Sequence, residues 1–229
     1  MGKERYLELD FLRGLTLIAM ILWHLAWDLM YYYHYPIRLD RGLMYWGFQF
    51  IAPTFMILAG ISSSFTRSHF RRAGRVLFFA ALLTAGSYVY DPEQAILFGI
   101  LHFMGVNMLL YPLYRRWPTW LLGGVALALI LSGRPVAEIN MPHNWFLPLG
   151  FRSHSYRSFD YFPLIPYAGY FITGVVLGRL LYPNGLARFR IHVPPNPVSF
   201  LGQHSLTGYL VHQPVLWTGL YLLHRWGLI

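Results

Sequence analysis

Long apolar stretches separated by short polar breaks run through the whole chain of 229 residues. Several of these stretches reach about 20 residues, the length that an α-helix needs to cross the apolar core of a bilayer. The breaks between them contain Pro, Gly, Asn and Arg, which are typical of helix ends and turns. The pattern therefore predicts an all-α fold, a polytopic membrane helix bundle of about seven transmembrane helices.

The predicted helices follow one another closely, and only one long irregular segment, at 133–161, interrupts them. We expect helices at 9–33, 42–66, 73–90, 95–114, 117–132, 162–182 and 198–224. Because the apolar stretches leave no room for a separate soluble part, we expect a single transmembrane domain over residues 1–229.

Composition supports a membrane location and narrows the function. Hydrophobic residues make up 56% of the chain and charged residues only 12%, whereas about 25% of a soluble protein is charged. The net charge of +9 would suit a nucleic-acid partner in a soluble protein, but cytoplasmic loops of membrane proteins carry excess Lys and Arg. We therefore expect membrane lipid and no nucleic acid as a partner. Cysteine is absent, which excludes a cysteine-bound acyl intermediate.

The distribution of basic residues predicts the orientation in the membrane. With seven helices, twelve of the 18 Lys and Arg residues fall on the side of the N-terminus and six on the opposite side. The positive-inside rule then places the N-terminus in the cytoplasm and the C-terminus outside.

Four ionisable residues of the first predicted helix share one stripe. Asp10, Arg13, His24 and Asp28 lie within about 60° of one another at 100° per residue. Such a stripe must face protein or water and not lipid. Asp10 and Arg13, one turn apart, suit a structural ion pair. Asp28 is placed to fix the tautomer of His24 for a general base, although a purely structural hydrogen bond between them has the same spacing.

Three histidines are expected at a similar depth in the outer half of the bilayer. His24, His102 and His212 belong to the first, fourth and seventh predicted helices. In the seventh, Ser205 and His212 share a polar face, and the proline after Gln213 interrupts the backbone hydrogen bonds. These residues predict a shared polar cavity, although a single buried histidine is more often structural. No His-x-x-x-His spacing occurs among them, so no metal site is expected.

Four short segments, in order along the chain, resemble one known family. They are 5–14 (RYLELDFLRG, followed by His24 and Asp28), 97–105 (LFGILHFMG), 159–164 (FDYFPL) and 201–214 (LGQHSLTGYLVHQP). Together they resemble bacterial members of the heparan-α-glucosaminide N-acetyltransferase catalytic-domain family, part of a superfamily of transmembrane acyltransferases.

The resemblance implies an enzyme and its substrates. An acyl group, acetyl foremost, would pass from acyl-CoA on the cytoplasmic side to a hydroxyl or amine on the outer side, usually of a sugar. A bacterial plasma membrane is the implied location. In the lysosomal relatives a histidine near the outer end of the first core helix is the catalytic base, and both His24 and His34 compete for that role here. We expect no luminal domain for a long glycan, so heparan sulfate itself is not the expected acceptor.

The residues and the resemblance combine into one scheme. His24, oriented by Asp28, or else His34 removes the proton of the acceptor, and His102 or His212 donates a hydrogen bond to the developing oxyanion. Gln213 and Ser205 line the cavity. The arginines expected to bind the phosphates of acyl-CoA are Arg13, Arg67, Arg71, Arg72, Arg75, Arg179, Arg188 and Arg190. The residues expected to bind the acceptor are His143, Asn144, Arg152, Arg157 and Asp160.

Two other functions fit the same polar stripe. In a transporter or flippase the stripe would conduct a substrate or protons, and in a non-catalytic membrane subunit it would serve folding alone. The arginines have an alternative role in topology, and the acceptor residues have one in an ordinary interfacial loop. Small-residue helix faces also permit a homodimer.

Overall fold

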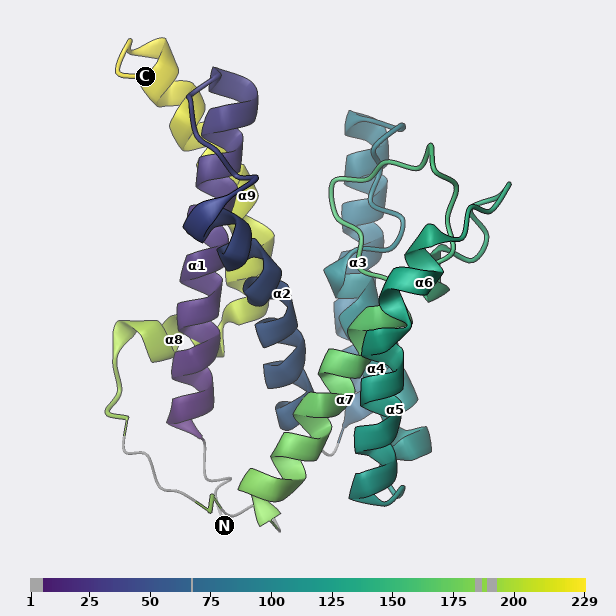
Figure 1. The fold of residues 1–229 in the computed structure, drawn as a ribbon. Helices are drawn as coiled ribbons and strands as arrows, with labels where there is room; N and C mark the ends of the chain where they lie inside the picture. Colours follow the sequence, from purple (N-terminus) through teal and green to yellow (C-terminus); the bar gives the residue numbers. More distant parts are fainter. Residues whose placement is uncertain (1–5, 67, 184–186, 189–192) are drawn as a thin grey trace. The chain divides into compact units, whose positions relative to one another are not determined.

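The computed structural model describes residues 6–66, 68–183, 187–188 and 193–229. All regular elements in these ranges are helices, apart from one isolated bridge between Asn140 and Arg152. The helices are α1 (Leu7–Tyr33), α2 (Gly42–Ser63), α3 (His69–Tyr90), α4 (Ile100–Tyr114), α5 (Thr119–Leu131), α6 (Gly133–Glu138), α7 (Leu164–Leu181), α8 (Pro197–Gln203) and α9 (Ser205–Arg225), with a 3-10 turn η1 (Leu147–Leu149) (Figure 1). The predicted all-α class is confirmed.

Five helical stretches in the described part of the chain are long and apolar enough to cross a membrane. They are Leu7–Tyr33, Met44–Ser63, His69–Tyr90, Thr119–Glu138 and Leu164–Leu181. The fourth predicted helix, as α4, is apolar but has only 15 residues. These stretches support an integral membrane protein, while the total of about seven spans stays a prediction.

The chain forms two compact units, which are described separately. The first unit contains Met1–Phe55 and Arg190–Ile229, and the second contains Met56–Phe189. The boundary falls inside α2, so the first part of this helix belongs to the first unit and its last two turns to the second.

In the first unit, α1 packs against α8 and α9 (Figure 1). A Cβ atom at Gly202 would lie 1.8 Å from the backbone oxygen of Asp10, and one at Gly14 would lie 1.9 Å from that of Val198. Only glycine therefore allows the backbones of α1 and α8 to come this close. Near the other end of α1, the ring centroids of Tyr33 and of His224 on α9 lie 5.2 Å apart. Helices α1 and α9 consequently run in the same direction.

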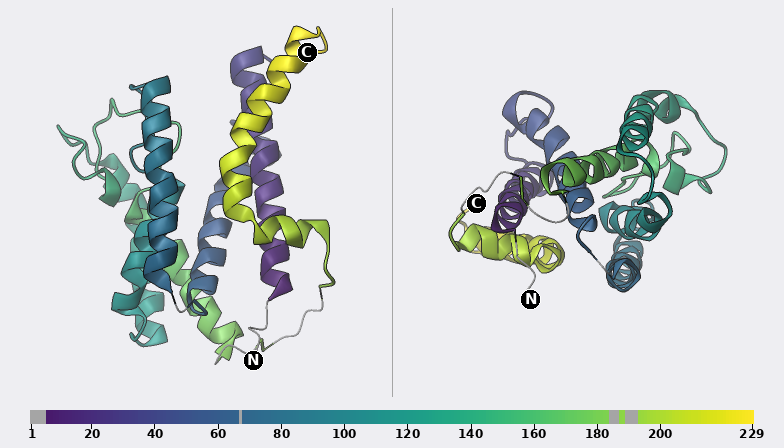
Figure 2. Two further views of the ribbon diagram at one scale, coloured as in Figure 1. Left: turned by 180° about the vertical axis from the view of Figure 1, so that it is seen from behind. Right: turned by 90° about the horizontal axis from the view of Figure 1, so that it is seen from below.

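The seventh predicted helix is two helices and not one. His204 has non-helical dihedral angles (φ −105°, ψ 27°) and separates α8 from α9, and α8 crosses α1 while α9 runs along it (Figure 2). The crosswise contact of α8 with α1 through Gly202 requires this bend. Pro214, by contrast, lies inside α9 and does not end it.

In the second unit, α3 packs on α4, and α5 packs on α7. The last turns of α2 also approach α7 closely, because a Cβ atom at Gly174 would lie 2.1 Å from the backbone oxygen of Ile57. Helix α4 begins at Ile100 and not at residue 95. The residues before it form an irregular segment with turns and bends. This segment accepts hydrogen bonds from 158–162, through Phe159 N to Gln94 O at 3.0 Å and Phe162 N to Phe98 O at 3.1 Å.

We expect Gly202→Ala to destabilise the protein by about 1–3 kcal/mol, the usual cost of forcing extra atoms into a packed contact. Gly219→Ala is the matched control, since a Cβ atom there meets nothing within 4 Å and alanine favours a helix by up to about 1 kcal/mol over glycine. The melting temperature of the detergent-purified variants measures both effects. An unchanged melting temperature for Gly202→Ala would contradict the close contact of α1 and α8.

Candidate active site

A pair of histidines from α1 and α9 forms the centre of the polar group in the first unit. The rings of His24 and His212 meet edge to face, with centroids 4.9 Å apart. His24 Nδ1 lies 2.9 Å from the backbone oxygen of Met20, and His212 Nδ1 contacts the backbone oxygen of Tyr209. A carbonyl oxygen only accepts hydrogen bonds, so each Nδ1 carries the proton and each neutral ring presents Nε2 as a lone pair. In both neutral rings Nε2 is therefore unprotonated, as the proton-accepting atom of a general base must be.

Asp28 lies one turn beyond His24 on α1 and is fully buried, with 0% of its surface exposed. The side-chain nitrogen of Gln213 donates to both carboxylate oxygens, at 3.0 and 2.9 Å. The indole of Trp217, one turn further along α9, also hydrogen bonds to Asp28. Trp217 was not among the residues predicted from the sequence, although its spacing of four from Gln213 puts it on the same helix face.

The predicted hydrogen bond between Asp28 and His24 is wrong. The spacing of four residues places both side chains on one face, as expected, but His24 bonds to the carbonyl of Met20 on its own helix. Asp28 takes its partners from α9. A charged group buried this deeply requires several donors, and an amide and an indole supply more than one imidazole nitrogen does.

The other predicted residues of the first unit lie apart from this pair. His34 is the exposed C-cap of α1, in a left-handed conformation with φ 57°, about 15 Å along the helix from His24 at 1.5 Å per residue. Ser205 begins α9, about 10 Å along that helix from His212. Arg13 binds Asp10 at 2.7 Å, so the predicted structural ion pair is confirmed. At His24 and Asp28 the stripe of α1 faces protein, one of the two surroundings expected, because these residues contact His212 and Gln213 of α9.

His102 has a structural role at the start of α4 in the second unit. Its Nδ1 accepts from the backbone N–H of Gly99 at 3.2 Å, and its Nε2 lies 3.1 Å from Thr84 Oγ1. The hydroxyl of Thr84 in turn donates to the carbonyl of Ile96 at 2.6 Å. Both ring nitrogens are therefore occupied, and a neutral His102 has no donor for an oxyanion.

Asp160, predicted to bind the acceptor, caps the same helix. Its Oδ2 accepts from the backbone N–H of Ile100 at 2.9 Å, where a carboxylate also suits the positive end of the helix dipole. Nearby, the Arg152 guanidinium lies 5.6 Å from the ring centroid of Tyr161. Burial raises the pKa of Tyr161 to about 12, and the nearby Arg152 opposes this shift.

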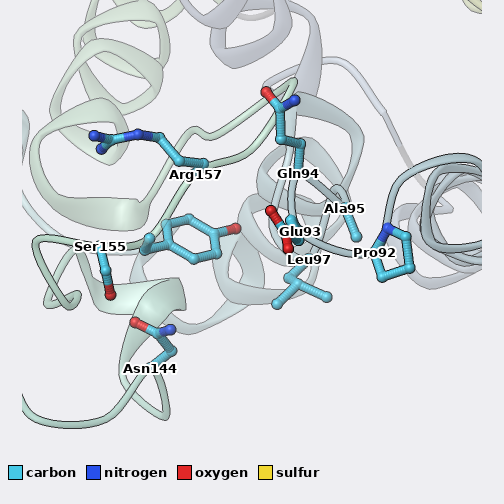
Figure 3. Close-up of a pocket in the computed structure, with 9 residues that line it drawn as sticks. Pro92, Glu93, Gln94, Ala95, Leu97, Asn144, Ser155 and Arg157 are labelled. Carbon is cyan, nitrogen blue, oxygen red and sulfur yellow. The ribbon is translucent and has the colours of Figure 1, made fainter.

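The second unit contains a pocket of about 620 Å³ between the loop after α3 and the loop before α7 (Figure 3). Asn144 and Arg157, both predicted for the acceptor, line it. Glu93, Gln94 and Ser155 add further polar groups that the sequence did not single out. Figure 3 shows these side chains arriving from the two loops. The Asn144 oxygen accepts from the backbone of Ser153 at 3.0 Å, which fixes the amide at the rim.

His143 and Arg152 are not among the residues that line the pocket. The ring of His143 stacks on that of Trp145, with centroids 5.3 Å apart. The structure thus divides the predicted acceptor residues into two that line a pocket and three that do not.

Among the predicted phosphate-binding arginines some are exposed, one is bound to backbone carbonyls, and two lie outside the described residues. Arg71, Arg72 and Arg75 are exposed on the first turns of α3, and Arg72 and Arg115 both act electrostatically on His69. Arg179 is occupied, because it donates to the backbone oxygens of Arg115 and Trp117, both at 2.6 Å.

Arg188 is exposed. Arg67 and Arg190 lie outside the described residues. No cluster of three or more His, Asp or Glu side chains in the described part of the chain is arranged to hold a metal ion.

We expect Asp160→Ala to lower the stability by about 1 kcal/mol, the usual effect of losing a helix cap, because the first N–H of α4 then lacks its acceptor. Asp40→Ala, at an exposed carboxylate, is the control and should melt like the wild type. Thermal unfolding in detergent measures both. Equal melting temperatures for all three proteins would show that the cap contributes nothing.

Comparison with known proteins identifies one family. The family model described as heparan-alpha-glucosaminide N-acetyltransferase, catalytic, matches residues 5–214. No curated protein and no solved structure matches the chain. The matched range contains α1, the pocket of the second unit, and α9 as far as Pro214, so it includes both His24 and His212. The chain therefore belongs to the heparan-alpha-glucosaminide N-acetyltransferase catalytic family and is a membrane enzyme of the acetyltransferase type.

Proposed function

We propose that the protein transfers an acyl group, acetyl foremost, from cytoplasmic acyl-CoA to a hydroxyl or amine of a sugar or other small acceptor on the outer side of the membrane. The observation that carries the proposal is the meeting of His24 and His212, whose rings lie 4.9 Å apart beside a buried carboxylate. Ionisable groups in membrane helices generally mark a functional path. A lone pair on each Nε2 is what proton removal requires.

The reaction needs one general base, which takes a proton from the acceptor and then gives it to the leaving coenzyme A. His24 Nε2 takes the proton of the acceptor hydroxyl or amine while that atom attacks the thioester carbonyl. The carbon–sulfur bond then breaks, and the thiolate of coenzyme A leaves with the proton. We favour His24 over His34 as the base, because His24 has a second histidine and a buried carboxylate near it, whereas His34 is exposed at a helix end.

The histidines do not suit the oxyanion role considered from the sequence. A neutral His212 has its proton on Nδ1, bound to the carbonyl of Tyr209, and His102 is occupied at both nitrogens. His212 would donate from Nε2 only as an imidazolium. We therefore propose His212 as a partner of the base and not as the donor to the oxyanion.

The acyl-CoA phosphates would bind to the exposed arginines at the start of α3. Arg71, Arg72 and Arg75 lie within two helical turns, and guanidinium binds phosphate in a bidentate manner. Arg72 also donates to the hydroxyl of Thr66 at 3.3 Å. Arg13 and Arg179 already have partners in Asp10 and in the backbone carbonyls. These two are accordingly weaker candidates than the sequence suggested.

The proposed acceptor region is the pocket of the second unit. A carboxylate, a guanidinium, two amides and a hydroxyl, from Glu93, Arg157, Gln94, Asn144 and Ser155, line it. Such mixed polar groups suit the hydroxyl and amine groups of a sugar.

The proposed orientation has the N-terminus in the cytoplasm and the C-terminus outside. It follows from the excess of basic residues on the N-terminal side. Helices α1 and α9 run in the same direction within the first unit. If both cross the membrane, the start of α1 and the end of α9 lie on opposite sides of it, as this orientation requires.

We expect acetyl-CoA to raise the melting temperature of the detergent-purified protein. A ligand that binds only the native state stabilises it by about 2.7 kcal/mol at a concentration of 100 Kd. Acetate at the same concentration is the control for the acetyl group. Transport of a solute into liposomes, together with no stabilisation by any coenzyme A thioester, would favour the rival transporter and contradict the proposal.

We expect His24→Ala to abolish the transfer of a labelled acetyl group from acetyl-CoA and to leave stabilisation by coenzyme A unchanged. Loss of a general base lowers the rate by about 10²–10⁴-fold. His34→Ala is the comparison, and we expect it to keep most of the activity. Full activity in His24→Ala would remove this residue from the mechanism, and full activity in both variants would overturn the proposed base.

A further inference from the structure

Two buried acceptor atoms on α9 have no hydrogen-bond partner among the described residues. They are Nε2 of His212 and Oε1 of Gln213, which are adjacent in the sequence. A buried polar atom without a partner destabilises the fold, so native proteins keep few of them. Both residues face α1, where His212 lies against His24 and Gln213 binds Asp28 one turn further along. The two atoms thus mark a part of the α1–α9 contact where a ligand can supply the missing donors.

Asp28 determines that the amide of Gln213 presents its oxygen here. A carboxylate accepts hydrogen bonds and does not donate them. Because Gln213 Nε2 donates to both oxygens of Asp28, the amide oxygen must point away from the carboxylate. The indole of Trp217, which is only a donor, also bonds to Asp28 and keeps the carboxylate in its accepting role.

We propose that Asp28 is a positioning residue that acts through Gln213, so that Gln213 Oε1 and His212 Nε2 together form a subsite for a ligand group with N–H or O–H donors. This inference rests on the proposed function and deepens it. Asp28 was expected to act on His24. In this inference it instead orients Gln213, and so determines which ligand groups the subsite binds.

The subsite accepts a definite kind of chemistry. Both its atoms are acceptors, so an amide N–H, an amine or a hydroxyl binds, whereas a group with acceptors only, such as an ether, leaves both atoms unpaired. Two sources supply such donors in the proposed reaction: the amides of the pantetheine arm of acyl-CoA, and the acceptor molecule itself. Separate Michaelis constants for the two substrates distinguish these sources.

The decisive change is Asp28→Asn. With Trp217 bound to the remaining oxygen, the new amide nitrogen faces Gln213, whose side chain turns over and presents its nitrogen to the subsite. The amide nitrogen of Gln213, a hydrogen-bond donor, then faces the N–H or O–H donor of the ligand. With acetyl-CoA and glucosamine as probes, we expect KM for one of them to rise about 10- to 100-fold, the effect of one unpaired hydrogen-bonding group. The pH dependence of kcat should stay that of the wild type, because His24 is untouched.

The double exchange Asp28→Asn with Gln213→Glu tests the orientation directly. One oxygen of the new glutamate accepts from the asparagine nitrogen, and the other occupies the place of Gln213 Oε1. The single buried negative charge is retained. We expect KM to return to within about threefold of the wild type, a difference of less than 1 kcal/mol. Gln213→Met, which removes the acceptor oxygen, should resemble Asp28→Asn.

Glu138→Gln, the same kind of change in an exposed ion pair with Arg134, is the control and should leave both KM values unchanged. A double variant that melts like the wild type but keeps the raised KM would overturn the inference. So would an Asp28→Asn variant with an altered pH profile of kcat and normal KM, since Asp28 would then act on the base. If the wild type transfers no acetyl group, the proposed function fails and not this inference. The variants are then compared by how much acetyl-CoA or glucosamine raises the melting temperature of each, and the same order of affinities is expected.

Discussion

The buried carboxylate of Asp28 is the constraint on which the first unit depends. No water reaches it, since 0% of its surface is exposed, and an unpaired charge in such a place is strongly destabilising. The donors that satisfy it come from Gln213 and Trp217, one turn apart on α9. This requirement ties α9 to α1 at one register, and the packing of the two helices follows from it.

The histidine pair depends on that register. His212 precedes Gln213 directly, so the bond that holds Gln213 on Asp28 also brings His212 to His24, one turn below Asp28 on α1. Glycines complete the arrangement at the other end, where Gly14 and Gly202 let α8 cross α1 with backbone in contact. The bend at His204 between α8 and α9 is therefore part of the construction of the site.

The polar residues of the second unit show how often such groups serve the fold. Asp160 and His102 both bind backbone N–H groups at the start of α4, and Arg179 binds the carbonyls that follow its end. Helix ends leave backbone groups without partners, and in an apolar surrounding these need side-chain partners. Other polar residues, such as Glu93 and Arg157, line the pocket, and Arg157 also donates to the backbone oxygen of His154.

The sequence by itself determined the helical class, the membrane location, the polar stripe of α1 and the family, because hydrophobic length, helical periodicity and ordered motifs are local properties. It also indicated His24 and His212 as candidates, since a histidine in an apolar helix is conspicuous. It did not determine that Asp28 binds Gln213 instead of His24, that His102 and Asp160 cap α4, or that the last helix bends at His204. Each of these depends on which side chain or backbone comes close across the fold, and spacing along one helix contains no such information.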